Sequence, residues 1–220
     1  MRIGKKEITG IIFDMDGTLL DSMPEWENTA RRVTEYYQLF CDKEVCDVFM
    51  KSPAENIGYY LKSRFDLKNT VKDIAGVIND TIFTAYSERM KTKPYIPELL
   101  DYLKNERVKL AVATATEKNT AVSALKLNHI LDYFEAVVSC DELHTDKHSP
   151  EVYFEALKRI AADQDSVAVA EDALYAACTA KEAGFFVIGV KDDSMESDWE
   201  KMLEISDVCI HSAKELIMKG

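Results

Sequence analysis

The chain has 220 residues, of which 47% are hydrophobic and 30% are charged, so it contains enough apolar side chains for a large buried core. This length exceeds one ordinary domain of about 100 to 150 residues but is too short for two large ones, which favours one large and one smaller domain. The 27 basic and 39 acidic residues give a formal net charge of −12. Such an acidic excess disfavours binding to nucleic acid or to an anionic membrane surface.

The five cysteines are odd in number and form no Cys-x-x-Cys pair, which indicates reduced thiols rather than a disulfide framework. The segment 1–13 contains only a brief apolar run, unlike a secretory signal. The longest apolar run elsewhere, at 185–190, is far shorter than the roughly 20 residues of a membrane helix. We therefore expect a cytoplasmic protein that binds neither nucleic acid polymers nor membranes, and the sequence indicates no oligomeric state.

A short apolar segment at 8–13 runs into Asp14-Met15-Asp16-Gly17-Thr18, which is typical of a buried strand that ends in a tight turn. The segments at 110–113, 167–170 and 186–190 have the same apolar character. None of these segments alternates polar with apolar residues. We therefore predict strands of a parallel sheet that is covered on both faces.

Between the first strand and Pro94 the sequence contains no convincing strand, and apolar residues recur there at helical spacing. The middle one of three predicted helices opens at Ser52-Pro53-Ala54-Glu55, a capping box with proline at the first helical position. The apolar stripe of the first helix comprises Trp26, Ala30, Val33, Tyr37 and Phe40, and that of the last comprises Val71, Ile74, Ala75, Ile78, Ile82 and Ala85.

From about residue 97 onward, predicted strands alternate with predicted helices. We expect Ser149 to cap a helix whose first position is Pro150, and Asp172 to cap a helix that stops at Gly184. This alternation predicts an α/β fold with a doubly wound, Rossmann-like parallel sheet. An all-α insert interrupts the sheet after its first strand.

Carboxylate and hydroxyl side chains follow the predicted strands. Asp14 and Asp16 are two residues apart and therefore point the same way, while Thr114 and Glu171-Asp172 end two later strands. Ligands of open α/β sheets bind outside the carboxyl ends of the strands, so these residues should converge in one crevice, beside Lys147 on a loop. Several carboxylates suit Mg²⁺. Together with Lys147, the metal would attract a phosphate group.

Each of these features has a simpler explanation when it is taken alone. The Asp-x-Asp-Gly segment also occurs in calcium loops and turns, Thr114 and Glu171-Asp172 could cap helices, and Lys147 could be an exposed surface residue. Their occurrence together at strand ends favours a catalytic site. His144 and His148 are four residues apart, but their segment is predicted to be a loop, which disfavours a zinc site.

The segment Asp14-Met15-Asp16-Gly17-Thr18-Leu19-Leu20-Asp21-Ser22 resembles the first motif of the haloacid dehalogenase superfamily, in the branch of β-phosphoglucomutase-like and phosphoglycolate phosphatase-like hydrolases. The later motifs match in order, with Thr114, then Lys147 in a Lys-x-x-Pro-Glu-x-Tyr segment, then Glu171-Asp172 before an alanine-rich helix. The resemblance covers essentially the whole chain. It implies a discontinuous core domain of residues 1–20 and 93–220, with a helical cap domain at 21–92.

The resemblance also implies a Mg²⁺-dependent phosphatase that hydrolyses a small phosphorylated metabolite, a phosphomonoester, through an aspartyl-phosphate. Asp14 would be the nucleophile, and Asp16 would act as general acid and then as general base. Thr114, the N–H group of Ala115 and Lys147 would bind the phosphate.

For the metal, the resemblance implies three ligands, namely the Asp14 carboxylate, the Asp16 backbone carbonyl and the Asp172 carboxylate, with Glu171 orienting a metal-bound water. The dehalogenases of the superfamily need no metal and lack the second aspartate. The phosphonate hydrolases replace that aspartate by alanine and use a cap lysine. Neither chemistry fits this chain as well as phosphate ester hydrolysis does.

Two departures from the mutase pattern favour a simple phosphatase. Trp26 stands where the mutase has a cap histidine, and Met50-Lys51-Ser52 lacks the basic pattern of the mutase's sugar-phosphate loop. A β-phosphoglucomutase-like sugar phosphomutase therefore remains the alternative enzyme. Ala173 and Ala176 stand where relatives usually carry serine and glycine, which leaves a non-catalytic phosphate-binding relative as a third possibility.

Overall fold

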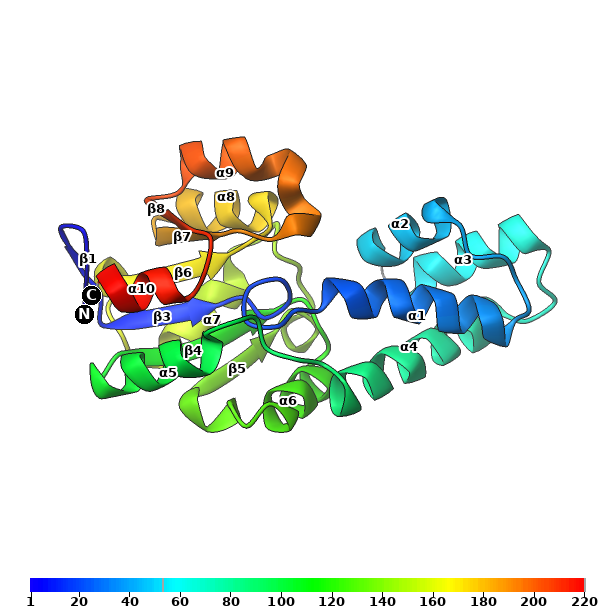
Figure 1. Ribbon diagram of the computed structural model, residues 1–220, viewed down its shortest axis with the longest axis horizontal. Helices are drawn as coiled ribbons and strands as arrows, with labels where there is room; N and C mark the ends of the chain where they lie inside the picture. Colours follow the sequence, from blue (N-terminus) through cyan, green and yellow to red (C-terminus); the bar gives the residue numbers. More distant parts are fainter. Residues whose placement is uncertain (53, 220) are drawn as a thin grey trace. The chain divides into compact units, whose positions relative to one another are not determined.

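The structure is a computed structural model that describes residues 1–52 and 54–219. The chain divides into two compact units, each drawn in Figure 1. The first, here called the core unit, comprises Met1–Asp21 and Lys91–Gly220, and the second, here called the helical unit, comprises Ser22–Met90.

The core unit contains a parallel sheet with the strand order β5-β4-β3-β6-β7-β8 (Figure 1). From β3 the chain adds β4 and β5 on one side, and from β6 it adds β7 and β8 on the other, so the direction of winding reverses between β3 and β6. The predicted doubly wound α/β fold is therefore confirmed. The strands are β3 (Gly10–Phe13), β4 (Lys109–Thr114), β5 (Ala136–Ser139), β6 (Val167–Glu171), β7 (Phe186–Val190) and β8 (Val208–Ile210), and a separate hairpin contains β1 (Arg2–Ile3) and β2 (Lys6–Glu7).

Helices cover both faces of this sheet. On one face, α7, α8 and α9 contribute to a buried apolar cluster with the strands, and on the other face α5 packs against α10 (Figure 1). The helices of the core unit are α5 (Ile96–Asn105), α6 (Lys118–Leu127), α7 (Glu151–Arg159), α8 (Leu174–Glu182), α9 (Trp199–Ile205) and α10 (Lys214–Lys219). Short 3₁₀ turns lie at Leu131–Tyr133, Asp141–Leu143, Gln164–Ser166 and Asp193–Asp198.

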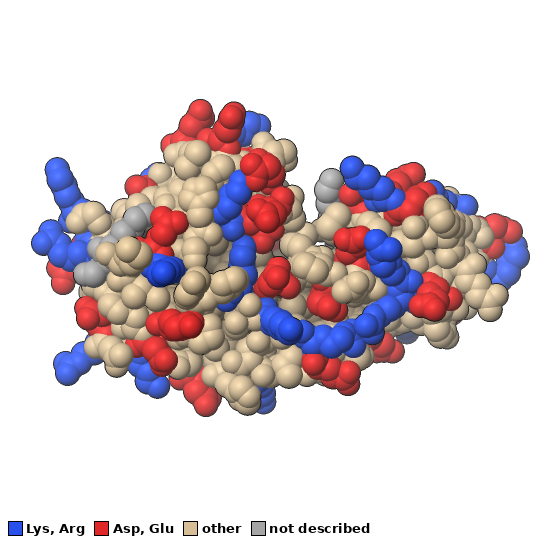
Figure 2. Space-filling view, viewed as in Figure 1, with Lys and Arg blue, Asp and Glu red and all other residues tan. Residues whose placement is uncertain are grey.

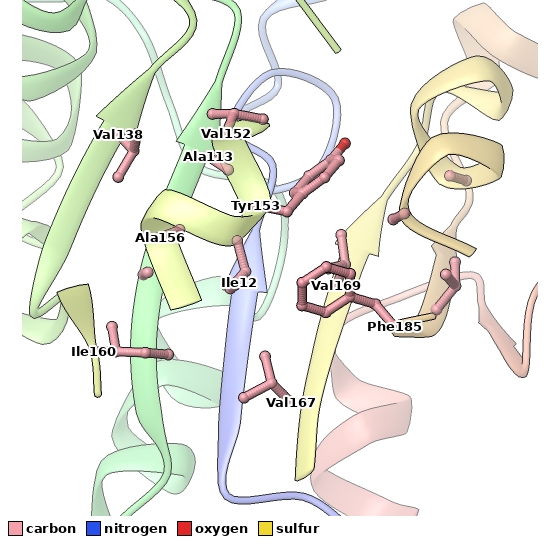
Figure 3. Packing of buried hydrophobic residues seen from close by; sticks show 14 of the residues in the cluster. Ile12, Ala113, Val138, Val152, Tyr153, Ala156, Ile160, Val167, Val169 and Phe185 are labelled. Atoms are coloured by element: carbon pink, nitrogen blue, oxygen red, sulfur yellow. The ribbon is translucent and has the colours of Figure 1, made fainter. Parts of the chain in front are cut away.

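Figure 3 shows how α7 packs on the sheet. Tyr153 lies over the strands that carry Ile12 and Val169, and its hydroxyl group is at the carboxyl end of β3. The Tyr153 side chain is fully buried and its ring meets that of Phe185 edge-on, with the ring centroids 6.2 Å apart. This packing holds the Tyr153 hydroxyl group in place at the carboxyl ends of the strands.

Two predicted helix caps in the core unit are wrong. Pro150 itself occupies the N-cap position of α7, and the Ser149 hydroxyl donates to the carboxylate of Glu151 rather than capping the helix. Ala173 occupies the N-cap position of α8, and no side chain caps this helix. The carboxylate of Asp172 instead accepts a hydrogen bond from the hydroxyl of Thr18, 3.1 Å away, because tertiary contacts hold it elsewhere.

The helical unit contains α1 (Met23–Tyr36), α2 (Lys43–Lys51), α3 (Ala54–Phe65) and α4 (Val71–Glu88). α2 is not among the three helices predicted for this segment; the Asp42 carboxylate caps it by accepting from the N–H group of Val45 at 3.1 Å. The stripe predicted for α4 is confirmed in part, since three of its residues are fully or almost fully buried, namely Ile74, Ile78 and Ala85. The capping box predicted at residues 52–55 depends on Pro53, which lies outside the described residues.

The stripe predicted for the first helix is too long. α1 ends at Tyr36, because Gln38 adopts a left-handed backbone conformation with φ of 56° and the N–H group of Leu39 bonds back to the carbonyl of Thr34. Phe40 therefore lies beyond the helix and is 76% exposed.

Figure 2 shows basic side chains interspersed with acidic ones over the displayed face of the molecule.

The five cysteines are free thiols. Among the residues that the structure describes, no helix combines the length and the apolar character needed to cross a membrane.

Two glycines offer a matched test of the packing. A Cβ atom at Gly189 in β7 would lie 2.7 Å from Ser206 Oγ and 2.8 Å from Met202 Cγ, whereas a Cβ atom at Gly76 in α4 would meet nothing within 4 Å. We expect Gly189→Ala to lower the free energy of unfolding by about 1–3 kcal/mol through overpacking. Gly76→Ala should raise it by about 0.5–1 kcal/mol, because alanine favours the helix. Urea denaturation measures both, and a stability change of the same sign in the two variants would contradict this packing.

Candidate functional site

The register of the sheet places the candidate residues side by side. Phe13 of β3 pairs with Val112 of β4 and with Ala170 of β6. The next residue, Asp14, therefore leaves β3 beside the end of each neighbour, and its N–H group donates to the Ala170 carbonyl at 2.9 Å. Glu171 is the last residue of β6. The site forms where the direction of winding reverses, which is the usual ligand site of such sheets.

The Lys147 side chain lies between two carboxylates. Its Nζ atom donates to Asp14 Oδ1 and, at 2.6 Å, to Glu171 Oε1. Glu171 Oε1 also accepts from the Tyr153 hydroxyl at 2.7 Å. Lys147 is 3% exposed and Glu171 is fully buried, so removal of either partner would leave an uncompensated buried charge, at a cost of about 3–5 kcal/mol.

Burial and mutual repulsion shift the ionisation of this cluster. Burial, and then the charge of Glu171, raise the pKa of Asp14 to about 7, although Lys147 acts in the opposite direction. Burial together with the charges of Asp14 and Glu171 raises the pKa of Asp172 well above its usual value. Burial alone would lower the pKa of Lys147, but Asp14 and Glu171 raise it well above normal, so Lys147 remains a cation.

Asp16 lies outside this buried cluster and is only half-buried. Its Oδ2 atom accepts from the Thr116 hydroxyl at 2.6 Å. Thr114, which is fully buried at the end of β4, accepts from the N–H group of Thr116 at 3.0 Å. Ala115 lies between these threonines and is exposed. The end of β4 and the residues that follow it therefore hold Asp16 and also carry Thr114 and Ala115, two of the three residues predicted to bind phosphate.

Gly17 allows the turn after Asp16 to approach Asp172 closely. Its φ of 82° is in the left-handed region, and a Cβ atom at this position would lie 2.3 Å from Asp172 Oδ2. Its N–H group donates to the carbonyl of Leu20 at 2.9 Å. Any residue with a side chain would therefore displace Asp172.

Lys93 holds the same turn from the other side. Its Nζ atom donates to the carbonyl of Gly17 at 2.7 Å, to the carbonyl of Lys191 at 3.0 Å, and to Asp192 Oδ2 at 2.7 Å. These bonds tie the segment that follows Met90 to the turn after β3 and to the end of β7. Lys93 and Asp192 thus support the position of the loop that carries Asp16.

The acidic cluster has the composition of a divalent cation site. One carboxylate oxygen from each of Asp14, Glu171 and Asp172 lies within 4.8 Å of the others. Within the described residues, Glu171 Oε2 is buried without a hydrogen-bond partner. Within the described part of the chain, the ion pairs of these carboxylates are those of Lys147 with Asp14 and with Glu171. Ionisation of all three carboxylates would therefore leave surplus negative charge in the cluster. Oxygen ligands of this kind fit Mg²⁺.

The structure thus brings Asp14, Lys147, Glu171 and Asp172 into one buried cluster, with Asp16 and Thr114 on the segments beside it. His144 and His148 are not in the acidic group that could hold a metal, as far as the described residues show. Four supporting residues have no role that is predicted from the sequence, namely Thr18, Lys93, Thr116 and Asp192. The sequence also assigns no role to Tyr153, which ends the Lys-x-x-Pro-Glu-x-Tyr segment, because nothing local in the sequence indicates its contact with Glu171.

Two curated relatives align with most of the chain. It is 28% identical over 207 residues to the phosphorylated carbohydrates phosphatase of Thermotoga maritima, which covers 94% of this chain and 95% of that protein. It is 26% identical over 184 residues to the fructose-1-phosphate phosphatase of Escherichia coli, which covers 83% of this chain and 96% of that protein. The predicted enzyme class, a phosphoric monoester hydrolase, agrees with both relatives.

Solved structures share the fold. A Thermotoga maritima crystal structure with the provisional name beta-phosphoglucomutase superposes with a TM-score of 0.81 at 26% identity, covering 96% of this chain and 97% of that one. CbbY from Rhodobacter sphaeroides superposes with a TM-score of 0.78 at 20% identity, covering 95% and 96%. The family model of haloacid dehalogenase-like hydrolases matches residues 11–190. This match confirms the resemblance found in the sequence, and the chain belongs to the haloacid dehalogenase-like hydrolase family.

Proposed function

We propose that this protein is a Mg²⁺-dependent phosphatase that hydrolyses a small phosphomonoester through an aspartyl-phosphate on Asp14. The observation that carries the proposal is the Lys147 ammonium group held between Asp14 and Glu171 at the carboxyl ends of β3 and β6. A lysine in this position offsets the repulsion between a carboxylate nucleophile and an anionic phosphate ester. Asp172 in the same cluster would supply a further metal ligand.

In the first step, a carboxylate oxygen of Asp14 attacks phosphorus and forms a P–O bond while the bond from phosphorus to the leaving oxygen breaks. The leaving oxygen takes a proton from Asp16. The hydrogen bond from Thr116 keeps Asp16 oriented in a half-buried position, where it can reach both the ester and solvent. Thr114 accepts the N–H of Thr116 and so retains its own hydroxyl proton for a phosphate oxygen.

In the second step, Asp16 removes a proton from a water molecule, which attacks the phosphorus of the aspartyl-phosphate. The P–O bond to Asp14 breaks, and inorganic phosphate and the Asp14 carboxylate are regenerated. Lys147 compensates negative charge on Asp14 and the phosphoryl group throughout. Glu171 and Tyr153 act by holding the ammonium group in place.

The carboxylates of Asp14 and Asp172, with the backbone carbonyl of Asp16, would hold the Mg²⁺ ion. When bound, the ion supplies positive charge that stabilises the oxygens of the transferring phosphoryl group. Glu171 would orient a water ligand of the ion through Oε2, the oxygen that has no hydrogen-bond partner in the described part of the chain. Burial, and then the charges of the neighbouring carboxylates, raise the pKa values of Asp14 and Asp172, and a bound cation would relieve the repulsive part of both shifts.

We further propose that the leaving group is a carbohydrate. Three relatives bear the names phosphorylated carbohydrates phosphatase, fructose-1-phosphate phosphatase and hexitol phosphatase B. The helical unit would serve as the cap domain, with residues 1–20 and 93–220 as the catalytic domain. Other relatives are named pyrophosphatase or FMN phosphatase, so a panel of phosphate esters is the appropriate first screen.

The nucleophile is tested by Asp14→Asn, which keeps the size of the side chain but removes its nucleophilic oxygen. We expect the rate of phosphate release from p-nitrophenyl phosphate to fall by about 10⁴-fold or more, as for other essential nucleophiles. Asp165→Asn, an exposed residue just before β6, is the matched control and should retain full activity. Substantial turnover by a folded Asp14→Asn protein would refute the assignment.

The metal site is tested by removal and by binding. Dialysis against a chelator should abolish hydrolysis, and added Mg²⁺ should restore it. Isothermal titration calorimetry should show that Asp172→Asn weakens Mg²⁺ binding by at least about tenfold, whereas Asp165→Asn leaves it unchanged. Equal Mg²⁺ affinity in the Asp172→Asn and wild-type proteins would place the ion elsewhere.

The reaction products separate the proposal from its alternatives. With a sugar phosphate substrate, we expect free phosphate to appear in equal amount to the substrate consumed, as Trp26 in place of the mutase histidine suggests. An isomeric sugar phosphate formed with activation by a bisphosphate would instead identify a phosphomutase. No metal-dependent hydrolysis of any ester in the panel would favour a non-catalytic phosphate-binding protein.

A further inference from the structure

Two aromatic rings lie against each other beside the buried cluster. The rings of His148 and Tyr175 have their centroids 4.7 Å apart, with an angle of 32° between the ring planes. His148 directly follows Lys147, and Tyr175 lies in the first turn of α8, three residues after Asp172. The two segments that carry the charged cluster therefore also carry this ring pair.

The pair lies at the solvent-facing margin of the site. Tyr175 is 45% exposed and His148 is also exposed, whereas Lys147, Glu171 and Asp172 are buried. Partial burial raises the pKa of Tyr175 to about 12, and the charges of Lys147, Glu171 and Asp14 also act on its phenol group. The charged groups of the cluster therefore act on the Tyr175 phenol, which keeps its hydroxyl proton at neutral pH.

The internal packing of the protein does not account for these side chains. Within residues 1–52 and 54–219, neither the phenol hydroxyl of Tyr175 nor the imidazole of His148 has a hydrogen bond to another protein group. A large ring left exposed with an unused donor suits contact with a ligand. The stacking on His148 restricts the motion of the Tyr175 ring, so less conformational entropy is lost when a ligand binds.

We propose that Tyr175, supported by His148, is a specificity-determining residue that packs against the leaving group of the substrate at the mouth of the phosphate site. This inference rests on the proposed phosphatase function. The ring face suits the C–H face of a sugar, and the phenol and imidazole edges suit its hydroxyl groups. A leaving group that carried a carboxylate or a second phosphate would place this anion near the carboxylates of the cluster, which would repel it.

Tyr175→Ala tests this inference when it is assayed with fructose 1-phosphate, glucose 6-phosphate and acetyl phosphate, whose leaving group is small. The measured quantity is the ratio of specificities, which is kcat/KM for the better sugar phosphate divided by kcat/KM for acetyl phosphate. We expect this ratio to fall about tenfold, mainly through a higher KM for the sugar phosphate. Tyr175→Phe keeps the ring and should lower this ratio by only about threefold, and His148→Ala should have an intermediate effect. The inhibition constant of inorganic phosphate should change less than the KM of the sugar phosphate.

Phe154→Ala is the control for loss of an exposed aromatic side chain. Phe154 is 40% exposed and stacks on Phe185, which precedes β7 and so lies at the amino ends of the strands, away from the site. This variant should leave the ratio of specificities unchanged. Circular dichroism and urea denaturation establish that each variant is folded.

The outcomes distinguish this inference from the proposed function. An unchanged ratio in Tyr175→Ala and in Tyr175→Phe, with wild-type hydrolysis of a sugar phosphate, would overturn the inference and leave the phosphatase intact. Wild-type hydrolysis of acetyl phosphate but of neither sugar phosphate would also overturn the inference. A wild-type protein that hydrolyses none of the three esters would overturn the inference, and the proposed function would be overturned with it if no other ester of the panel were hydrolysed.

Discussion

The site depends on one buried cation, the ammonium group of Lys147 between Asp14 and Glu171. Without it, three carboxylates at the ends of adjacent strands would repel one another in a region with almost no solvent. Tyr153 extends this contact into the apolar core, since its hydroxyl binds Glu171 while its ring packs on the sheet. The packing of α7 and the position of the reactive carboxylate are therefore parts of the same arrangement.

Several backbone constraints converge on this cluster. The parallel register brings the ends of β3, β4 and β6 together, and the left-handed conformation of Gly17 leaves room for Asp172 where any side chain would collide. Lys93 Nζ then donates hydrogen bonds to the Gly17 carbonyl and to the Asp192 carboxylate, which hold this turn in place. The acidic residues behind the formal charge of −12 are partly concentrated in this site. A divalent cation bound there would neutralise them locally.

The sequence predicted the central strands well, because short, uninterrupted apolar runs such as Phe186–Val190 are typical of the buried strands of a parallel sheet. It missed β5, β8 and α2, whose spans of three to nine residues carry too weak a periodicity. Local rules failed for the cap expected at Asp172, since the contact with Thr18, 154 residues away in sequence, decides where its side chain lies. The Lys93–Asp192 pair spans 99 residues and leaves no local signal at all.

The central claim is that the Asp14 carboxylate takes up the phosphoryl group while Lys147 remains its cationic partner. Acid quenching during turnover, followed by mass spectrometry of the peptides, tests this most directly. The account predicts one added phosphoryl group on Asp14, removed by hydroxylamine as expected of an acyl phosphate. A phosphoryl group on any other residue, or turnover without a phosphorylated protein under conditions that trap such intermediates, would contradict it.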